Sequence, residues 1–98
     1  MRLRLLCICS WNHPSSELRD ALRAHHLEAA IARVDIEPAL RAALARGAYS
    51  AVIYVRGLTG LGLDVVQTRM LLLAMTMPLV VVDTLAEAGE RLAAMFAP

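Results

Sequence analysis

The chain has 98 residues and a formal net charge of +1, and it contains no lysine, because all 10 basic residues are arginine. At this length we expect one domain with a small core, over residues 1–98. The weak net charge gives no electrostatic reason to expect binding to nucleic acid or to an anionic membrane surface. Hydrophobic residues make up 58% of the chain, which excludes a disordered composition.

Two features bear on where the protein works. The longest apolar stretch, Met70–Val82, is interrupted by Pro78 and is too short to span a bilayer, so no membrane partner is expected. The two cysteines, Cys7 and Cys9, do not have the spacing of a disulfide framework. We therefore expect a cytoplasmic protein.

The chain alternates between apolar runs and helical patterns. Continuous apolar runs are typical of parallel strands that are covered on both faces. The runs that predict such strands are residues 3–9, 29–34, 50–55 and 79–83.

A helical pattern follows each of these runs. The first helix is expected to open at residues 14–17, with a serine as its N-cap, and the second at Asp35 and to stop at Gly47. The third is expected over residues 64–77, between an N-cap at Asp64 and Pro78. The last should open with a capping box made by Thr84 and Glu87.

Four strand–helix units with short connections predict an α/β fold. We expect a flavodoxin-like, doubly wound parallel sheet of four strands in the order 2-1-3-4, with helices on both faces. In such sheets functional groups gather at the carboxyl ends of the strands. The segments expected at that edge are residues 9–13, 55–62 and 83–84.

The segment from Tyr49 to Val66 resembles the third strand, loop and third helix of response-regulator receiver domains. The resemblance rests on residues that match the leucines, glycines and valine of the receiver pattern, with one deletion, and Pro78–Val82 is similar to the fourth strand. The matching positions are Leu58, Gly60, Gly62, Leu63 and Val66. The resemblance implies a signalling or regulatory module.

The positions that carry receiver chemistry are altered in this chain. Cys9 and Ser10 stand where a receiver has the acidic pair that holds Mg²⁺, and Val55 stands at the phosphoacceptor aspartate. Asp83 replaces the hydroxyl residue, and the receiver lysine has no counterpart. The resemblance therefore implies a pseudo-receiver that acts independently of phosphorylation. We expect no enzymatic activity, no cofactor and no metal.

Cys9 supports an alternative from a different class. Residues 9–16 resemble the cysteine loop of the IIB phosphocarrier domains of sugar phosphotransferase systems, in which the cysteine carries the phosphoryl group. The other interpretation of Cys9 is a small hydrophobic residue packed at a strand end. Trp11, which follows, is either a surface anchor for a partner or a lid over the first strand.

The remaining motifs favour structural interpretations. Gly57, Gly60 and Gly62 have the wrong spacing for a dinucleotide site and predict a turn-rich loop. His25 and His26 are expected at a helix end, away from the strand carboxyl ends. A Toll/interleukin-receptor-like NAD⁺ module would need a catalytic glutamate, and residues 57–82 contain none.

The third helix predicts self-association. Its apolar residues surround the whole axis, whereas an outer helix of such a fold should have one polar face. The fourth strand is expected at a sheet edge without lysine, proline or charge to discourage pairing. We expect a homodimer, with a protein partner or output domain as a further possibility, through Met70, Leu72, Leu73, Leu79, Val81, Met95 and Phe96.

Overall fold

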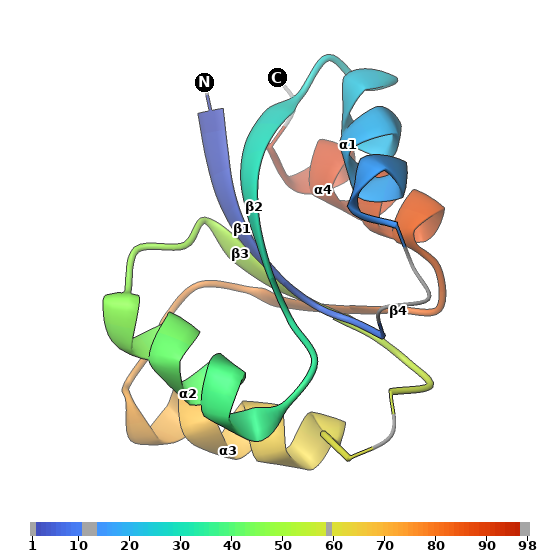
Figure 1. Ribbon diagram of the computed structural model, residues 1–98. Coiled ribbons are helices and arrows are strands. Elements are labelled where there is room, and N and C mark those ends of the chain that lie inside the picture. The colour runs from blue at the N-terminus through green and yellow to red at the C-terminus, as the bar shows by residue number, and fades with distance from the viewer. Residues whose placement is uncertain (1, 11–13, 59, 97–98) are drawn as a thin grey trace.

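The computed structural model describes residues 2–10, 14–58 and 60–96, and strands alternate with helices along them (Figure 1). The elements are β1 (Arg2–Ile8), α1 (Ser15–Arg23), β2 (Glu28–Val34), α2 (Glu37–Arg46), β3 (Ala51–Val55), α3 (Leu63–Leu72), β4 (Leu79–Val82) and α4 (Leu85–Phe96). The four strands are parallel and lie in the order β2-β1-β3-β4. The predicted flavodoxin-like class and strand order are confirmed.

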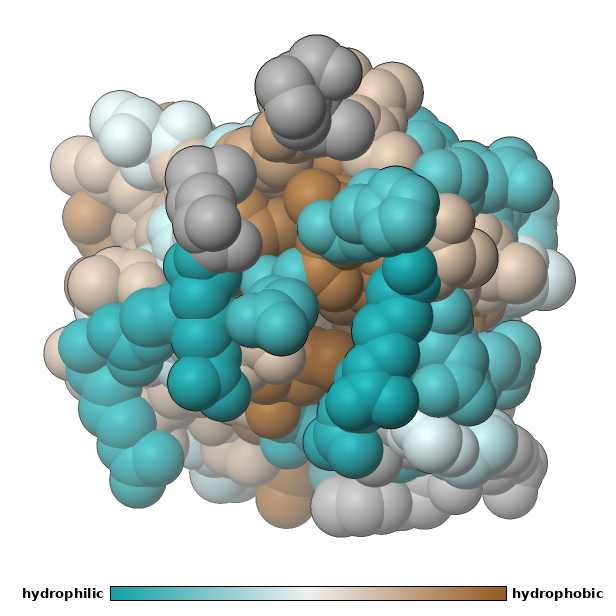
Figure 2. All heavy atoms as spheres, turned by 90° about the horizontal axis from the view of Figure 1, so that it is seen from above, coloured by the Kyte–Doolittle hydropathy of each residue, from teal (hydrophilic) through white to brown (hydrophobic). Residues whose placement is uncertain are grey.

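Helices cover both faces of the sheet: α1 and α4 pack on one face, and α2 and α3 on the other (Figure 1). Neighbouring residues of β1 therefore enter different cores, since Leu5 belongs to the α1–α4 side and Leu6 to the α2–α3 side, and both are fully buried. Figure 2 views the end at which β1 begins, where apolar atoms are visible between hydrophilic side chains. Within the described residues, none of the helices is long and apolar enough to cross a membrane.

The predicted capping box of α4 is present in a shifted form. The backbone N–H of Glu87 donates to Thr84 Oγ1 at 3.1 Å, as predicted. The Glu87 carboxylate accepts at 3.1 Å from the N–H of Asp83, one residue before the position expected for a capping box.

The other three predicted N-caps are wrong. α1 follows Pro14, α2 follows Ile36 and α3 follows Gly62, and none of these caps makes a side-chain hydrogen bond. Asp64 lies in the first turn of α3, where its charge complements the helix dipole.

Helix α3 ends at Leu72, five residues before the predicted end. The backbone of Ala74 is left-handed (φ 51°), and its N–H donates to the carbonyl of Leu71 at 3.0 Å. The N–H of Met75 reaches back to the carbonyl of Met70, also at 3.0 Å. This pair of bonds is a Schellman motif. Its left-handed position usually holds glycine, so the alanine gave no sequence signal for the helix end.

Replacing Ala74 by glycine should stabilise the fold by about 0.5–1 kcal/mol, because glycine adopts the left-handed conformation without a steric penalty. Urea unfolding measures the change. The matched control is Ala94→Gly in the exposed part of α4, which should instead lose about 1 kcal/mol. Loss of stability in both variants would contradict the left-handed assignment of Ala74.

The loop between β3 and α3 is held by a buried side chain. The hydroxyl of Tyr54 donates to the carbonyl of Leu61 at 2.8 Å, and burial raises the pKa of Tyr54, with the charge of Asp64 adding to the effect. Gly60 has φ of 86°, whereas Gly62 has an ordinary φ of −79°. Gly57 also has a positive φ, of 97°, so two of the three glycines in the predicted turn-rich loop adopt a conformation that favours glycine.

Candidate functional site

The carboxyl ends of β1, β3 and β4 meet at one edge of the sheet, where doubly wound parallel sheets gather their functional groups. Val55 is buried there and offers no nucleophile. Arg56 and Asp83 follow β3 and β4, and Arg56 Nη1 lies 3.2 Å from Asp83 Oδ1 in an ion pair exposed to solvent. In the described part of the chain, no three His, Cys, Asp or Glu side chains lie close enough to hold a metal ion.

A thiol pair occupies the end of β1. Cys7 lies on β1 and Cys9 directly follows its last residue, and both side chains enter the core between the sheet and α1 and α4. The Cys7 thiol donates a hydrogen bond to Cys9 Sγ, with 3.5 Å between the two sulfur atoms. Both cysteines are free and buried, and only 1% of the surface of Cys9 is exposed.

Arg33 is the cation next to this pair. It lies on β2 in register with Cys7, and its guanidinium Nη2 donates to the backbone carbonyl of Ser10. The hydrogen bond from Cys7 lowers the pKa of Cys9 most, and the charge and hydrogen bonding of Arg33 lower it further, to about 7. Burial and Asp35 oppose this shift. The pKa of Cys7 is raised, because its proton is held by Cys9 and because the thiol is buried.

The charge of Arg33 favours the thiolate form of Cys9, but the fold leaves reagents little access to this sulfur atom. A thiolate is the reactive form of cysteine, but it attacks only what reaches it, and Cys9 is enclosed. Trp11 and His13, which precede α1, lie outside the described residues. Sequence reasoning identified Cys9 and missed Arg33. The available signal was a charged residue near the end of an otherwise apolar strand.

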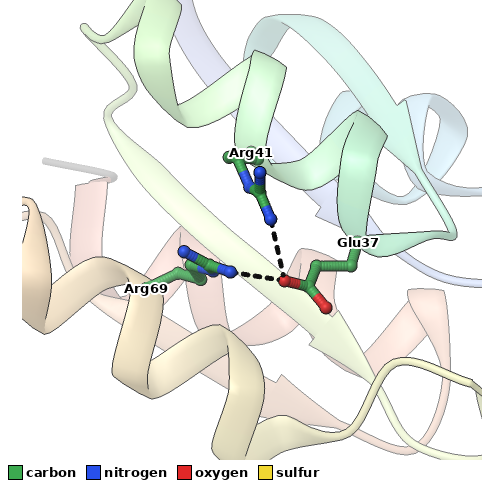
Figure 3. A network of polar contacts seen from close by, with 3 residues as sticks. All are labelled: Glu37, Arg41 and Arg69. Carbon is green, nitrogen blue, oxygen red and sulfur yellow. Dashed lines mark hydrogen bonds and ion pairs between the residues drawn. The ribbon is translucent and has the colours of Figure 1, made fainter.

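A second cluster joins α2 to α3. The Glu37 carboxylate on α2 accepts from Arg41 Nη2 at 3.4 Å and from Arg69 of α3, which reaches the same oxygen (Figure 3). Hydrogen bonding from Arg69, followed by that from Arg41, lowers the pKa of Glu37. The cluster is partly exposed. Its geometry serves to fix the two helices relative to each other.

The candidate interface residues do not form one surface. Met70 is buried in the α2–α3 core and is unavailable to a partner. Leu72 and Leu73 are exposed on the α3 side of the sheet, whereas Met95 is exposed on α4 and Phe96 packs against the α1–α4 core. The predicted interface residues therefore lie on both faces of the sheet.

The leucine turn, which we define as Leu71–Leu73 at the end of α3, is the most exposed apolar segment among the described residues. The exposed fractions of the three side chains are 79%, 71% and 51% in chain order. Leu71 was not among the predicted interface residues. Leu71 and Leu72 are the last two residues of α3 and Leu73 is its C-cap, and all three are exposed although the preceding Met70 is buried.

The outer edge of β4 is protected by an arginine. The carbonyl of Pro78 accepts from Val52 of β3 and that of Val82 from Arg56, which follows β3, each at 2.9 Å. The carbonyl of Val81 therefore faces away from β3. Arg91 Nη1 of α4 donates to that carbonyl at 2.7 Å. Leu79 and Val81 are partly buried against the α2–α3 core. At this carbonyl, the edge that the sequence predicted to be unprotected is covered by a charge from the following helix.

Comparisons with models of protein families, with curated proteins and with solved structures give no match.

Proposed function

We propose that the chain is a non-catalytic, receiver-like regulatory module that acts through protein–protein association and does not depend on phosphorylation. The leucine turn carries this proposal. Three consecutive leucines with at least half of each side chain in solvent form a patch of the kind that usually marks an interaction site. The carboxyl edge of the sheet supports the non-catalytic part, since Val55 stands at the acceptor position.

A second copy of the chain is the proposed partner. An apolar patch is complementary to itself, so a two-fold axis beside α3 would bury both leucine turns at once. Pairing of β4 with its mate is less favourable, because it would displace the Arg91 guanidinium from the carbonyl of Val81. The proposed dimer therefore uses α3 and leaves the sheet edge unpaired. The proposed location is the cytoplasm, where free thiols such as Cys7 and Cys9 stay reduced.

Leu72→Glu should separate the dimer without unfolding the chain. The side chain is mostly in solvent in the monomer, but in the dimer a carboxylate would be buried in an apolar contact. We expect the dissociation constant to rise by about 100-fold or more. Sedimentation equilibrium at micromolar concentration measures this change, and circular dichroism verifies the fold.

Met95→Glu is the matched control. Met95 is also exposed, but it lies on the other face of the sheet, so this variant should remain dimeric. A wild-type chain that is monomeric at these concentrations would refute self-association. Dissociation of Met95→Glu with a dimeric Leu72→Glu would place the contact on the α4 side instead.

A second candidate is the cysteine phosphocarrier. The observation in its favour is the pair of donors, the Cys7 thiol and the Arg33 guanidinium, which lower the pKa of Cys9 to about 7. A phosphocarrier also needs a thiol that reaches its donor, and Cys9 is enclosed. The reactivity of the native thiol therefore separates this candidate from the association module.

A further inference from the structure

A cavity of about 500 Å³ lies between α1 and the first residues of β1 and β2. It opens at the end of the molecule opposite the carboxyl ends of the strands. Figure 2 shows this face, where a hollow with apolar atoms at its floor lies between hydrophilic side chains. Its volume is within the range of small-molecule sites.

Three arginines line this cavity. Arg2 comes from the start of β1, and Arg19 and Arg23 lie one turn apart on α1. Like charges at this helical spacing repel each other and destabilise the helix. Glu28 is the one carboxylate lining the cavity, so the formal charge there is +2, from three arginines and one glutamate. None of the ion pairs found among the described residues involves these three arginines.

Part of the lining of the cavity is apolar. Ala29 and Ile31 of β2 contribute this part and are partly exposed, whereas Leu22 and Leu27 also line the cavity but are almost fully buried in the α1–α4 core. A ligand that fills the cavity would therefore contact hydrocarbon with one part and guanidinium groups with another. Arginine suits oxyanions better than lysine does, because its planar fork donates two parallel hydrogen bonds to phosphate or carboxylate oxygens.

We propose that this cavity binds a phosphate monoester that carries an apolar or aromatic body. At neutral pH such an ester has a charge of nearly −2, which matches the formal charge of the cavity. The phosphate oxygens lie among Arg2, Arg19 and Arg23, and the body rests on Ala29 and Ile31. The proposal does not depend on self-association, because the leucine turn belongs to α3 on the other face of the sheet.

The test is a calorimetric titration of the full chain with phenyl phosphate. We expect saturable binding that weakens as salt is added, since the contact is largely between charges. Inorganic phosphate lacks the apolar body and phenol lacks the charge, so each should bind at least about tenfold more weakly. Equal binding of inorganic phosphate would reduce the cavity to a general anion site and overturn the proposal. A dicarboxylate that binds more tightly than phenyl phosphate would also overturn it.

Charge-removing variants locate the site. Arg19→Gln and Arg23→Gln should each weaken phenyl phosphate binding by about tenfold. Arg56→Gln, an exposed arginine at the opposite end of the strands, is the matched control and should bind as the wild type does. Arg2→Gln provides a further test that leaves α1 unchanged. Absence of saturable binding at millimolar concentrations, or an equal loss in Arg56→Gln, refutes the proposal.

Discussion

Replacing Gly89 by alanine is expected to lower the free energy of unfolding by about 1–3 kcal/mol. Gly89 is buried on α4, where that helix crosses α1. A Cβ atom at this position would lie 2.6 Å from Ala21 Cβ and 3.1 Å and 3.2 Å from the backbone carbon and oxygen of Ala21. Because two of these neighbours are backbone atoms, a change of rotamer cannot relieve the contact, and α1 must move as a unit.

Helix propensity works in the opposite direction. Alanine is favoured over glycine inside a helix by about 1 kcal/mol, so the measured loss is what remains after that gain. Urea unfolding of Gly89→Ala gives the net change. Glu90→Ala, at the next and exposed position of α4, is the control and should stay within about 0.5 kcal/mol of the wild type.

A double variant identifies the cause. Ala21→Gly removes the closest of the three contacts but leaves the two backbone contacts. In that background Gly89→Ala should therefore recover part of the lost stability and not all of it. A neutral or stabilised Gly89→Ala variant would show that α1 and α4 do not approach as closely as described.

The strand order could be predicted because it depends on patterns that are local in the sequence. Leu5 and Leu6 are adjacent, and both are apolar, which suits only a strand with two covered faces. Short helical segments between such strands then require right-handed crossovers. The loop geometry at Gly60 followed from its residue type. For both the strands and this loop, the residue types themselves favour the structure that is observed.

The end of α2 at Gly47 and the Thr84 cap of α4 are as predicted, but several other helix boundaries could not be predicted, because their residues carry no distinctive signal. The left-handed residue that ends α3 is Ala74, and the caps of α2 and α3 are Ile36 and Gly62. Leu71 and Leu72 are helical as predicted, whereas Leu73 is the C-cap of α3 and not a residue of the helix interior.

The side-chain contacts of the candidate sites were also beyond prediction, because they join segments far apart in the chain. Arg33 reaches the thiol pair from the neighbouring strand, and Arg91 covers the carbonyl of Val81 from the following helix. Each arginine is an ordinary charged residue in the sequence. The fold brings Arg33 to Cys9, whose pKa it lowers, and it brings Arg91 to the carbonyl of Val81 at the sheet edge.

Cys7→Ala should raise the pKa of Cys9 from about 7 toward the ordinary value of 9.0, since the hydrogen bond from Cys7 is the largest cause of the shift. Cys7→Ser keeps a donor and should leave Cys9 more acidic than Cys7→Ala does. Thiolate absorbance in the ultraviolet, measured against pH, gives the value for each variant. If the pKa of Cys9 is the same in both variants, then Arg33 alone sets its acidity.

The same pKa predicts how Cys9 contributes to stability. Because the folded pKa of Cys9 lies below its ordinary value, deprotonation favours the folded chain. This contribution is fully present above about pH 9 and is lost as the pH falls through about 7. The raised pKa of Cys7 acts in the opposite direction above its ordinary value. In Cys7→Ala, the contribution of Cys9 between pH 7 and 9 should therefore decrease.

Access to Cys9 decides between the two proposed functions. A phosphocarrier requires the folded chain to react with iodoacetamide at neutral pH nearly as fast as a denatured chain does, since much of its thiol is ionised. The association module predicts slow labelling in the native state, because Cys9 is enclosed by the core whatever its charge. Denatured protein provides the reference rate, and Cys9→Ser shows how much of the labelling belongs to Cys7. Fast native labelling that disappears in Cys9→Ser would favour the carrier.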